Sequence, residues 1–155
     1  AIIAASILSV YAKDEMKPQT GGPVRVAPSD VKWETAAALP SGAQLAVLEG
    51  DPSKAGPFTI RVKMPADFKV PAHTHPVEER LTVIEGNFRY GDGERYDEKT
   101  LKEYPAGSYL VIPKNQAHFG GSKKGTVIQI IGNGPWDIHY LDQKEDPRRQ
   151  ESRKH

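Results

Sequence analysis

The chain has 155 residues, of which 37% are hydrophobic and 26% are charged. This length and composition predict one globular domain with an ordinary hydrophobic core, and they exclude a disordered or membrane-resident chain. A net charge of +1 argues against nucleic-acid binding. The absence of cysteine excludes disulfides, thiolate nucleophiles and metal sites built on Cys, so any metal must be held by His and carboxylate side chains.

Residues 1–12 (AIIAASILSVYA) carry no charge and resemble the hydrophobic region of a secretory signal. A helix of this length spans about 18 Å, which is too short for a bilayer core of about 30 Å, so no stable membrane span is expected. A buried N-terminal helix or strand is the alternative interpretation. We expect an exported protein, periplasmic or secreted, in which residues 13–29, interrupted by Pro and Gly, form a linker or N-terminal arm.

Residues 30–143 follow the two-residue period of β-strands. Apolar and polar side chains alternate without a break over Phe58–Met64, as in a half-buried strand. Further β-rich runs, separated by Gly- and Pro-containing turns, are Gly42–Glu49, Leu81–Tyr90, Ser108–Ile112 and Thr126–Ile131. Only Tyr96–Tyr104 favours a helix, of one or two turns. Short strands at close spacing predict an all-β sandwich or barrel.

The last residues, 144–155 (KEDPRRQESRKH), form a charged tail without any apolar side chain. Such a composition is typical of a solvated, frayed terminus. A basic contact surface is the alternative.

Histidine placement is the most informative feature of the chain. His73 and His75 occupy positions i and i+2, which in a strand face the same side about 6.6 Å apart. Glu79 follows with the same parity, and His118 comes in a later β-rich stretch. Such a set can hold a first-row divalent metal with coordination positions left open. A lone His-x-His pair is also typical of an ordinary polar strand face, so this spacing alone leaves both interpretations open.

Two stretches around these residues resemble the two sequence motifs of the cupin superfamily. The motif positions are occupied by Asp67, His73, His75, Glu79 and Gly86 in the first stretch, and by Gly107, Pro113, Asn115, His118 and Ser122 in the second. The resemblance spans Lys32 to Tyr140 and implies an all-β fold with one domain, the cupin double-stranded β-helix (jelly-roll barrel). The ending Gly132–Tyr140 resembles small, exported, single-domain cupins of the ChrR type.

Three positions depart from the family pattern. Asp67 and Asn115 stand where the motifs have Gly, and Ser122 stands where the second motif ends in Asn. Asp and Asn tolerate the left-handed conformation better than other non-glycine residues, so the first two changes are physically mild. We expect Ser122 to alter a turn hydrogen bond.

The resemblance implies that His73, His75, Glu79 and His118 bind one divalent transition metal, with Fe(II) favoured and Mn(II), Ni(II), Co(II), Zn(II) or Cu(II) also compatible. It implies a dioxygenase-type oxidoreductase that acts on a small-molecule substrate, and a homodimer. One alternative is a non-redox isomerase or lyase in which Glu79 is the catalytic base. The other is a non-catalytic sensor or scavenger that binds a metal or ligand.

The roles of several other side chains stay open at this level. Four aromatic residues could line an apolar pocket or simply pack in the core: Phe88, Tyr90, Tyr109 and Phe119. Arg61 and Gln129 could contact a substrate carboxylate or orient a ligand, although strand alternation favours a surface position for Arg61. His139 is expected on the surface or at an interface. The chain has no Gly-x-Ser-x-Gly nucleophile elbow.

Overall fold

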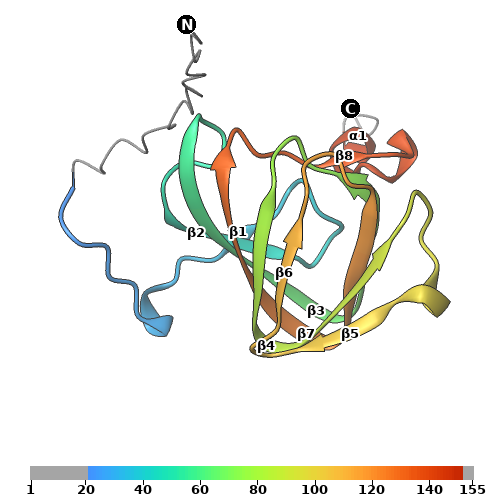
Figure 1. Cartoon of the computed structure of the whole chain (residues 1–155), viewed down its shortest axis with the longest axis horizontal. Coiled ribbons are helices and arrows are strands. Elements are labelled where there is room, and N and C mark those ends of the chain that lie inside the picture. Colours follow the sequence, from blue (N-terminus) through green and yellow to red (C-terminus); the bar gives the residue numbers. More distant parts are fainter. Residues whose placement is uncertain (1–20, 152–155) are drawn as a thin grey trace, which may run out of the picture.

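The computed structural model describes residues 21–151, and most of its regular structure is β-strand (Figure 1). The strands are β1 (Glu34–Thr35), β2 (Gln44–Glu49), β3 (Gly56–Thr74), β4 (Glu79–Asp92), β5 (Lys102–Pro105), β6 (Tyr109–Ile112), β7 (His118–Gly134) and β8 (His139–Tyr140). The helices are η1 (Pro28–Asp30), η2 (Glu98–Thr100), η3 (Gln143–Glu145) and α1 (Pro147–Glu151). Within residues 21–151, no helix is long and apolar enough to cross a bilayer.

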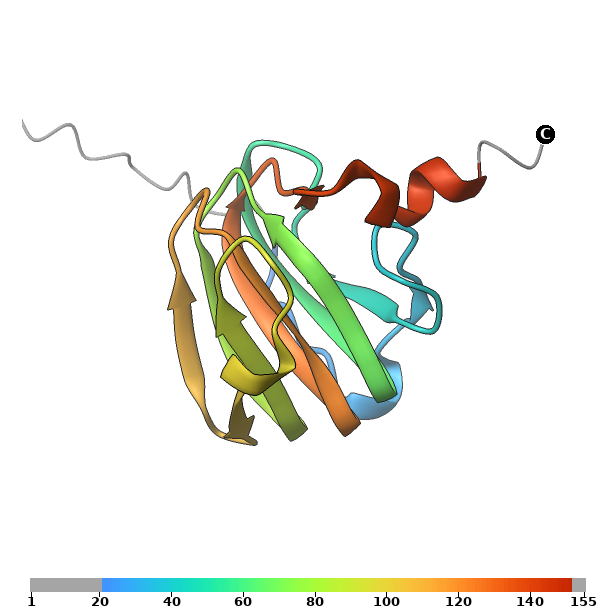
Figure 2. The ribbon, with the colours of Figure 1, turned by 90° about the vertical axis from the view of Figure 1, so that its right-hand side faces the viewer.

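All strand pairs are antiparallel and belong to one sheet. Its order is β1-β2-β3-β7-β4-β5, with β6 also paired to β4 and β8 also paired to β3. The long strands β3, β7 and β4 form the middle of the sheet, which curls into a barrel (Figures 1 and 2). This architecture confirms the prediction of an all-β, double-stranded β-helix fold.

The interior of the barrel follows from the alternation in the sequence. On β3, Phe58, Ile60 and Val62 point inward and are at most 2% exposed, whereas the residues between them are only partly buried. Inward-facing side chains of β4 and β7, including Leu81 and Ile128, complete the same core. The apolar face is therefore enclosed by the barrel, and its polar counterpart faces outward.

The long strands, and the turn between β6 and β7, bend at residues that favour positive φ. Asp67 and Asn115, which replace motif glycines, have φ of 55° and 61°, so both adopt the left-handed conformation that Asp and Asn tolerate best. Gly86 has φ of +69°, and a Cβ there would meet the carbonyl oxygen of Gly125. Ser122 makes a turn hydrogen bond, because its Oγ accepts from the backbone N–H of Gly125 at 2.8 Å.

Some local expectations were incomplete. The helix predicted over Tyr96–Tyr104 is present only as the short η2, and Lys102–Pro105 instead forms β5. Pairing with β4 places Tyr104 opposite Phe88, and this sheet contact overrides a segment too short to be stable as a helix. The short strands β1 and β8 also lacked a sequence signal.

The predictions for the two ends of the chain fall partly outside the described residues. The proposed signal remnant at residues 1–12 lies outside the described residues, as do His155 and residues 13–20 of the predicted arm. The charged tail is described as far as residue 151. Part of it is helical and lies beyond β8, outside the strands of the barrel (Figure 2).

Candidate metal centre

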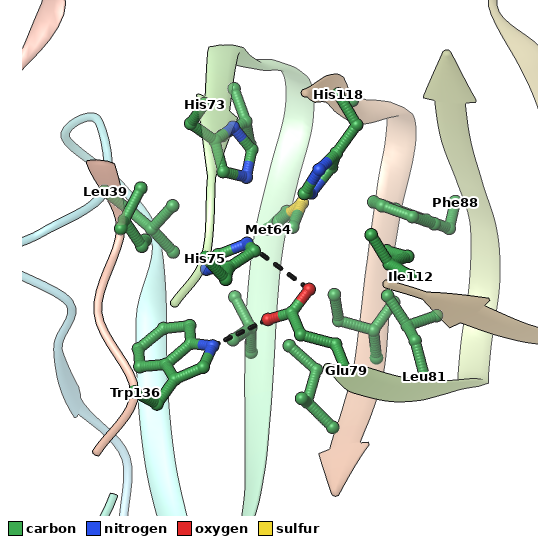
Figure 3. Close-up of a pocket in the computed structure, with 16 residues that line it drawn as sticks. Leu39, Met64, His73, His75, Glu79, Leu81, Phe88, Ile112, His118 and Trp136 are labelled. Atoms are coloured by element: carbon green, nitrogen blue, oxygen red, sulfur yellow. Dashed lines mark hydrogen bonds and ion pairs between the residues drawn. The ribbon is translucent and has the colours of Figure 1, made fainter. Parts of the chain in front are cut away.

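Three histidines meet at one end of the barrel interior (Figure 3). His73 is the last but one residue of β3 and is directly paired with His118, the first residue of β7. His75 follows one residue after the end of β3. One potential ligand atom from each of these three side chains lies within 4.8 Å of the other two. The sheet register therefore brings together histidines that are far apart in the sequence.

Backbone carbonyl groups orient all three imidazoles. The Nδ1 atoms of His73, His75 and His118 lie 2.6, 2.8 and 2.9 Å from the carbonyl oxygens of Pro71, Asp137 and Gln116. A carbonyl oxygen only accepts, so each Nδ1 carries the proton and each Nε2 keeps its lone pair. Fixing the tautomer in this way is what the outer partners of metal-binding histidines do.

Glu79 lies beside this cluster as the first residue of β4, and it is only 2% exposed. Its Oε1 accepts a hydrogen bond of 2.7 Å from the indole Nε1 of Trp136. Its Oε2 lies 3.3 Å from Nε2 of His75. Trp136 also stacks on the His75 ring, with ring centroids 5.4 Å apart and planes 13° apart (Figure 3).

Burial determines the charge state of the cluster. It lowers the pKa of His73 well below 6.5, and the neighbouring His118 and His75 lower it further. Burial also lowers the pKa of His75 to about 4 and lowers the pKa of His118. The three imidazoles are therefore neutral near pH 7, which is the form that binds metal ions.

The same burial raises the pKa of the Glu79 carboxyl, against the opposing effects of His118 and the Trp136 N–H. Since Nδ1 of His75 is protonated, its Nε2 and the Glu79 Oε2 are both electron-pair donors at their 3.3 Å separation. Two such atoms repel each other unless a proton or a cation lies between or beside them. Three neutral imidazoles with an adjacent carboxylate thus fit a divalent ion of the first transition row.

An apolar cavity of about 440 Å³, including its opening to solvent, adjoins the histidines. Its lining residues include, besides the histidines and Glu79, the apolar side chains Leu39, Met64, Leu81, Phe88, Ile112, Ile130, Trp136 and Ile138 (Figure 3). None of the described lining residues is a lysine or an arginine.

The four aromatic residues that the sequence offered as pocket residues lie in different places. Among the four aromatic candidates only Phe88 lines this cavity. Tyr90 stacks on His118 with ring centroids 5.5 Å apart, Phe119 packs against Tyr96 instead, and Tyr109 is 57% exposed.

The polar candidates lie away from the cavity. Arg61 donates to Gln129 at 3.0 Å, and neither residue lines the cavity. His139 is exposed, as predicted, and lies 3.4 Å from a carboxylate oxygen of Asp137. The sequence reading missed the contact of Trp136 with Glu79, for which no motif gives a signal.

The chain was compared with protein families and with curated proteins. A family model described as "Domain of unknown function (DUF4437)" matches residues 25–154. No curated protein matches the chain.

Solved structures share the fold at low identity. The polyketide cyclase RemF from Streptomyces resistomycificus aligns with a TM-score of 0.66 and 18% identity, over 83% of this chain and 92% of that chain. An RmlC-like cupin from Shewanella frigidimarina gives 0.56 and 13% over 72% and 91%. KdgF from Halomonas sp. gives 0.54 and 16% over 70% and 93%. The cupin fold is thereby confirmed, whereas the ChrR-type subgroup stays a prediction.

Proposed function

The chain belongs to the DUF4437 family, and on this premise we propose that it is a metal-dependent cupin, an oxidoreductase of the dioxygenase type that acts on a small organic molecule. The observation that carries the proposal is the cluster of three buried imidazoles with mutual ligand-atom distances within 4.8 Å. Neutral, pre-oriented imidazoles beside an apolar cavity are costly to build without a function, because buried polar groups need partners.

In this proposal His73, His75 and His118 hold the ion through Nε2, and Glu79 supplies the fourth ligand. Fe(II) is the favoured metal. When bound, such an ion supplies Lewis acidity and, because Fe(II) is redox-active, electrons for chemistry with O₂. The backbone carbonyls keep the imidazoles in the binding tautomer, and Trp136 fixes the Glu79 carboxylate through its 2.7 Å hydrogen bond.

The cavity restricts the class of substrate. Its described lining offers no cationic side chain to a substrate carboxylate or phosphate, and its walls are apolar apart from the histidines and Glu79. We therefore propose a small, mainly apolar substrate whose polar group faces the imidazoles. Excluding water from such a cavity strengthens every electrostatic contact inside it.

A second candidate function follows from Glu79 itself. Its buried carboxyl has a raised pKa, which is the property that suits a carboxylate for proton transfer near neutral pH. In a non-redox isomerase or lyase, Glu79 would take a proton from the substrate and return it at another atom. A third possibility, a sensor or scavenger without turnover, uses the same site for binding alone.

One experiment separates these functions. The metal-free protein is loaded with Fe(II) or Zn(II) and incubated with small molecules that carry two adjacent oxygen donors, for example catechol and a 1,3-diketone. We expect O₂ uptake and substrate loss with Fe(II) only. Substrate loss with Zn(II) without O₂ uptake would overturn the dioxygenase in favour of the isomerase or lyase. Stoichiometric capture without product would leave only the binding function.

The exported location and the homodimer stay predictions.

A further inference from the structure

The segment between β7 and β8 touches the predicted metal site at three successive residues. Trp136 donates to Glu79 at 2.7 Å, the carbonyl oxygen of Asp137 accepts from Nδ1 of His75 at 2.8 Å, and Ile138 lines the cavity. We call residues 136–138 the clamp segment. Its position determines both the carboxylate orientation of Glu79 and the ring orientation of His75.

A residue of the C-terminal helix holds this segment from outside. Nη1 of Arg148 donates to Oδ1 of Asp137 at 2.8 Å, and Nη2 donates to the carbonyl oxygen of Ile138 at 2.7 Å. Asp146 accepts from Nε at 2.9 Å and from Nη2 at 3.0 Å. All three guanidinium nitrogens are thus engaged, and Asp146 holds the plane in a bidentate pair.

This network is more than a surface ion pair. The Arg148 side chain is 36% exposed, and that of Asp146 is only 12% exposed. One planar guanidinium joins two elements that are separate in the chain, and it contacts both a side chain and a backbone carbonyl of the clamp segment. A lysine has a single nitrogen and cannot span these acceptors in the same geometry.

We propose that Arg148 is a positioning residue for the metal site: it holds the clamp segment so that the Asp137 carbonyl meets His75 and the Trp136 indole meets Glu79. The metal part of this inference rests on the proposed function. The charged segment at residues 144–155 would then contribute to the site through one arginine, although this residue touches neither substrate nor metal.

The first test uses Co(II) as the probe with the full chain in metal-free form. Arg148→Ala should weaken Co(II) binding about tenfold, the lower end of the range for losing an outer partner of a metal ligand. It should also change the visible absorption spectrum of bound Co(II), because the orientation of His75 and Glu79 alters. Arg148→Lys should lie between Arg148→Ala and the wild type in both Co(II) affinity and absorption spectrum. Arg80→Ala is the matched control, because Arg80 pairs on the surface with Glu78 at 2.9 Å.

The second test needs no metal. In a Trp33→Phe background, Trp136 is the remaining tryptophan of the two in the chain. Arg148→Ala should shift its fluorescence to longer wavelength, because the indole loses its fixed place in the clamp segment. If Arg148→Ala does not fold, Asp137→Asn serves instead, because it removes the charge that Nη1 contacts and retains the backbone carbonyl.

The outcomes are distinguishable. Wild-type affinity, Co(II) spectrum and Trp136 emission in a folded Arg148→Ala variant would overturn the positioning role. If the wild-type protein binds no Co(II), the proposed function fails, whereas a shifted Trp136 emission would still support the positional part of the inference. A partial recovery in Arg148→Lys would support a geometric role beyond charge alone.

Discussion

The two halves of the predicted metal site are held in different ways. His73 and His118 face each other across the β3–β7 ladder, so the backbone pairing of two long strands sets their separation. His75 and Glu79 lie just past one strand and at the start of the next, and their orientation depends on Asp137 and Trp136 of the clamp segment. One half is therefore part of the barrel framework, and the other is adjustable through side-chain contacts.

The two halves of the site should therefore tolerate substitution to different degrees. Moving His73 relative to His118 requires breaking the pairing of β3 with β7, which lies in the middle of the sheet. The adjustable half depends on a few hydrogen bonds, each contributing about 0.5–3 kcal/mol. Substitutions in the two halves should therefore have effects on metal binding that differ in magnitude and in cause.

The largest effect is expected in the framework half. His118→Ala should abolish stoichiometric binding of Co(II) or Fe(II), with a loss of more than about 100-fold, because losing an outer partner alone costs about 10–100-fold. The fold should persist, since the pairing of β3 with β7 uses backbone groups that the substitution leaves in place. Metal analysis and circular dichroism check both parts. His139→Ala, at an exposed histidine, is the control and should keep full occupancy.

Glu79→Gln should come next. The amide still accepts from Trp136, but it lacks the negative charge, so we expect loss of turnover and a fall in Co(II) affinity of about 10–100-fold. The metal-free variant should melt no lower than metal-free wild type, because no buried carboxyl needs desolvating. Glu78→Gln, at the exposed neighbouring carboxylate, is the matched control. Unchanged turnover in Glu79→Gln would contradict a role in the reaction.

A smaller effect is expected from Trp136→Phe in the adjustable half. The phenyl ring can keep the stack on His75 but cannot donate to Glu79. A hydrogen bond to a charged group contributes about 1.5–3 kcal/mol, so Co(II) affinity should fall about tenfold or somewhat more. Isothermal titration measures this, with Trp33→Phe as control. Equal affinities in the two variants would remove Trp136 from the account.

The smallest effect is expected at the bend of β3. Asp67→Gly introduces the residue that the cupin motif usually has, at a φ of 55°, and loses the surface pair with Lys123. These contributions oppose each other, and the exposed ion pair is weak because solvent screens it. The denaturation midpoint should therefore change little, with unaltered Co(II) affinity. A large loss of stability in denaturant titration would show that the bend depends on the aspartate.

The sequence predicts the framework half better than the adjustable half. Alternation over Phe58–Met64 and the position of His73 on the inner face of its strand follow from the two-residue period of strands, and the second motif indicates His118. The positive φ of Asp67 and Asn115 also follows from residue type and motif position. These features are local, or repeat a family pattern, so they can be read along the chain.

The clamp segment could not be predicted in the same way. The contacts Trp136–Glu79 and Arg148–Asp137 join residues whose spacing follows no secondary-structure period. Composition alone predicts that Arg148 is a solvated tail residue, because the acceptors it meets, Asp137, Ile138 and Asp146, are brought around it by the fold. Likewise, Lys102–Pro105 becomes a strand only through pairing with β4.

The central claim is that the three imidazoles and Glu79 share one divalent ion. X-ray absorption spectroscopy on the Fe(II)-loaded protein tests it most directly. We expect about three imidazole ligands, recognised by their multiple-scattering pattern. In His118→Ala, which should retain no stoichiometric iron, that imidazole signal should be lost. An iron environment made only of oxygen ligands, identical in wild type and His118→Ala, would contradict the claim.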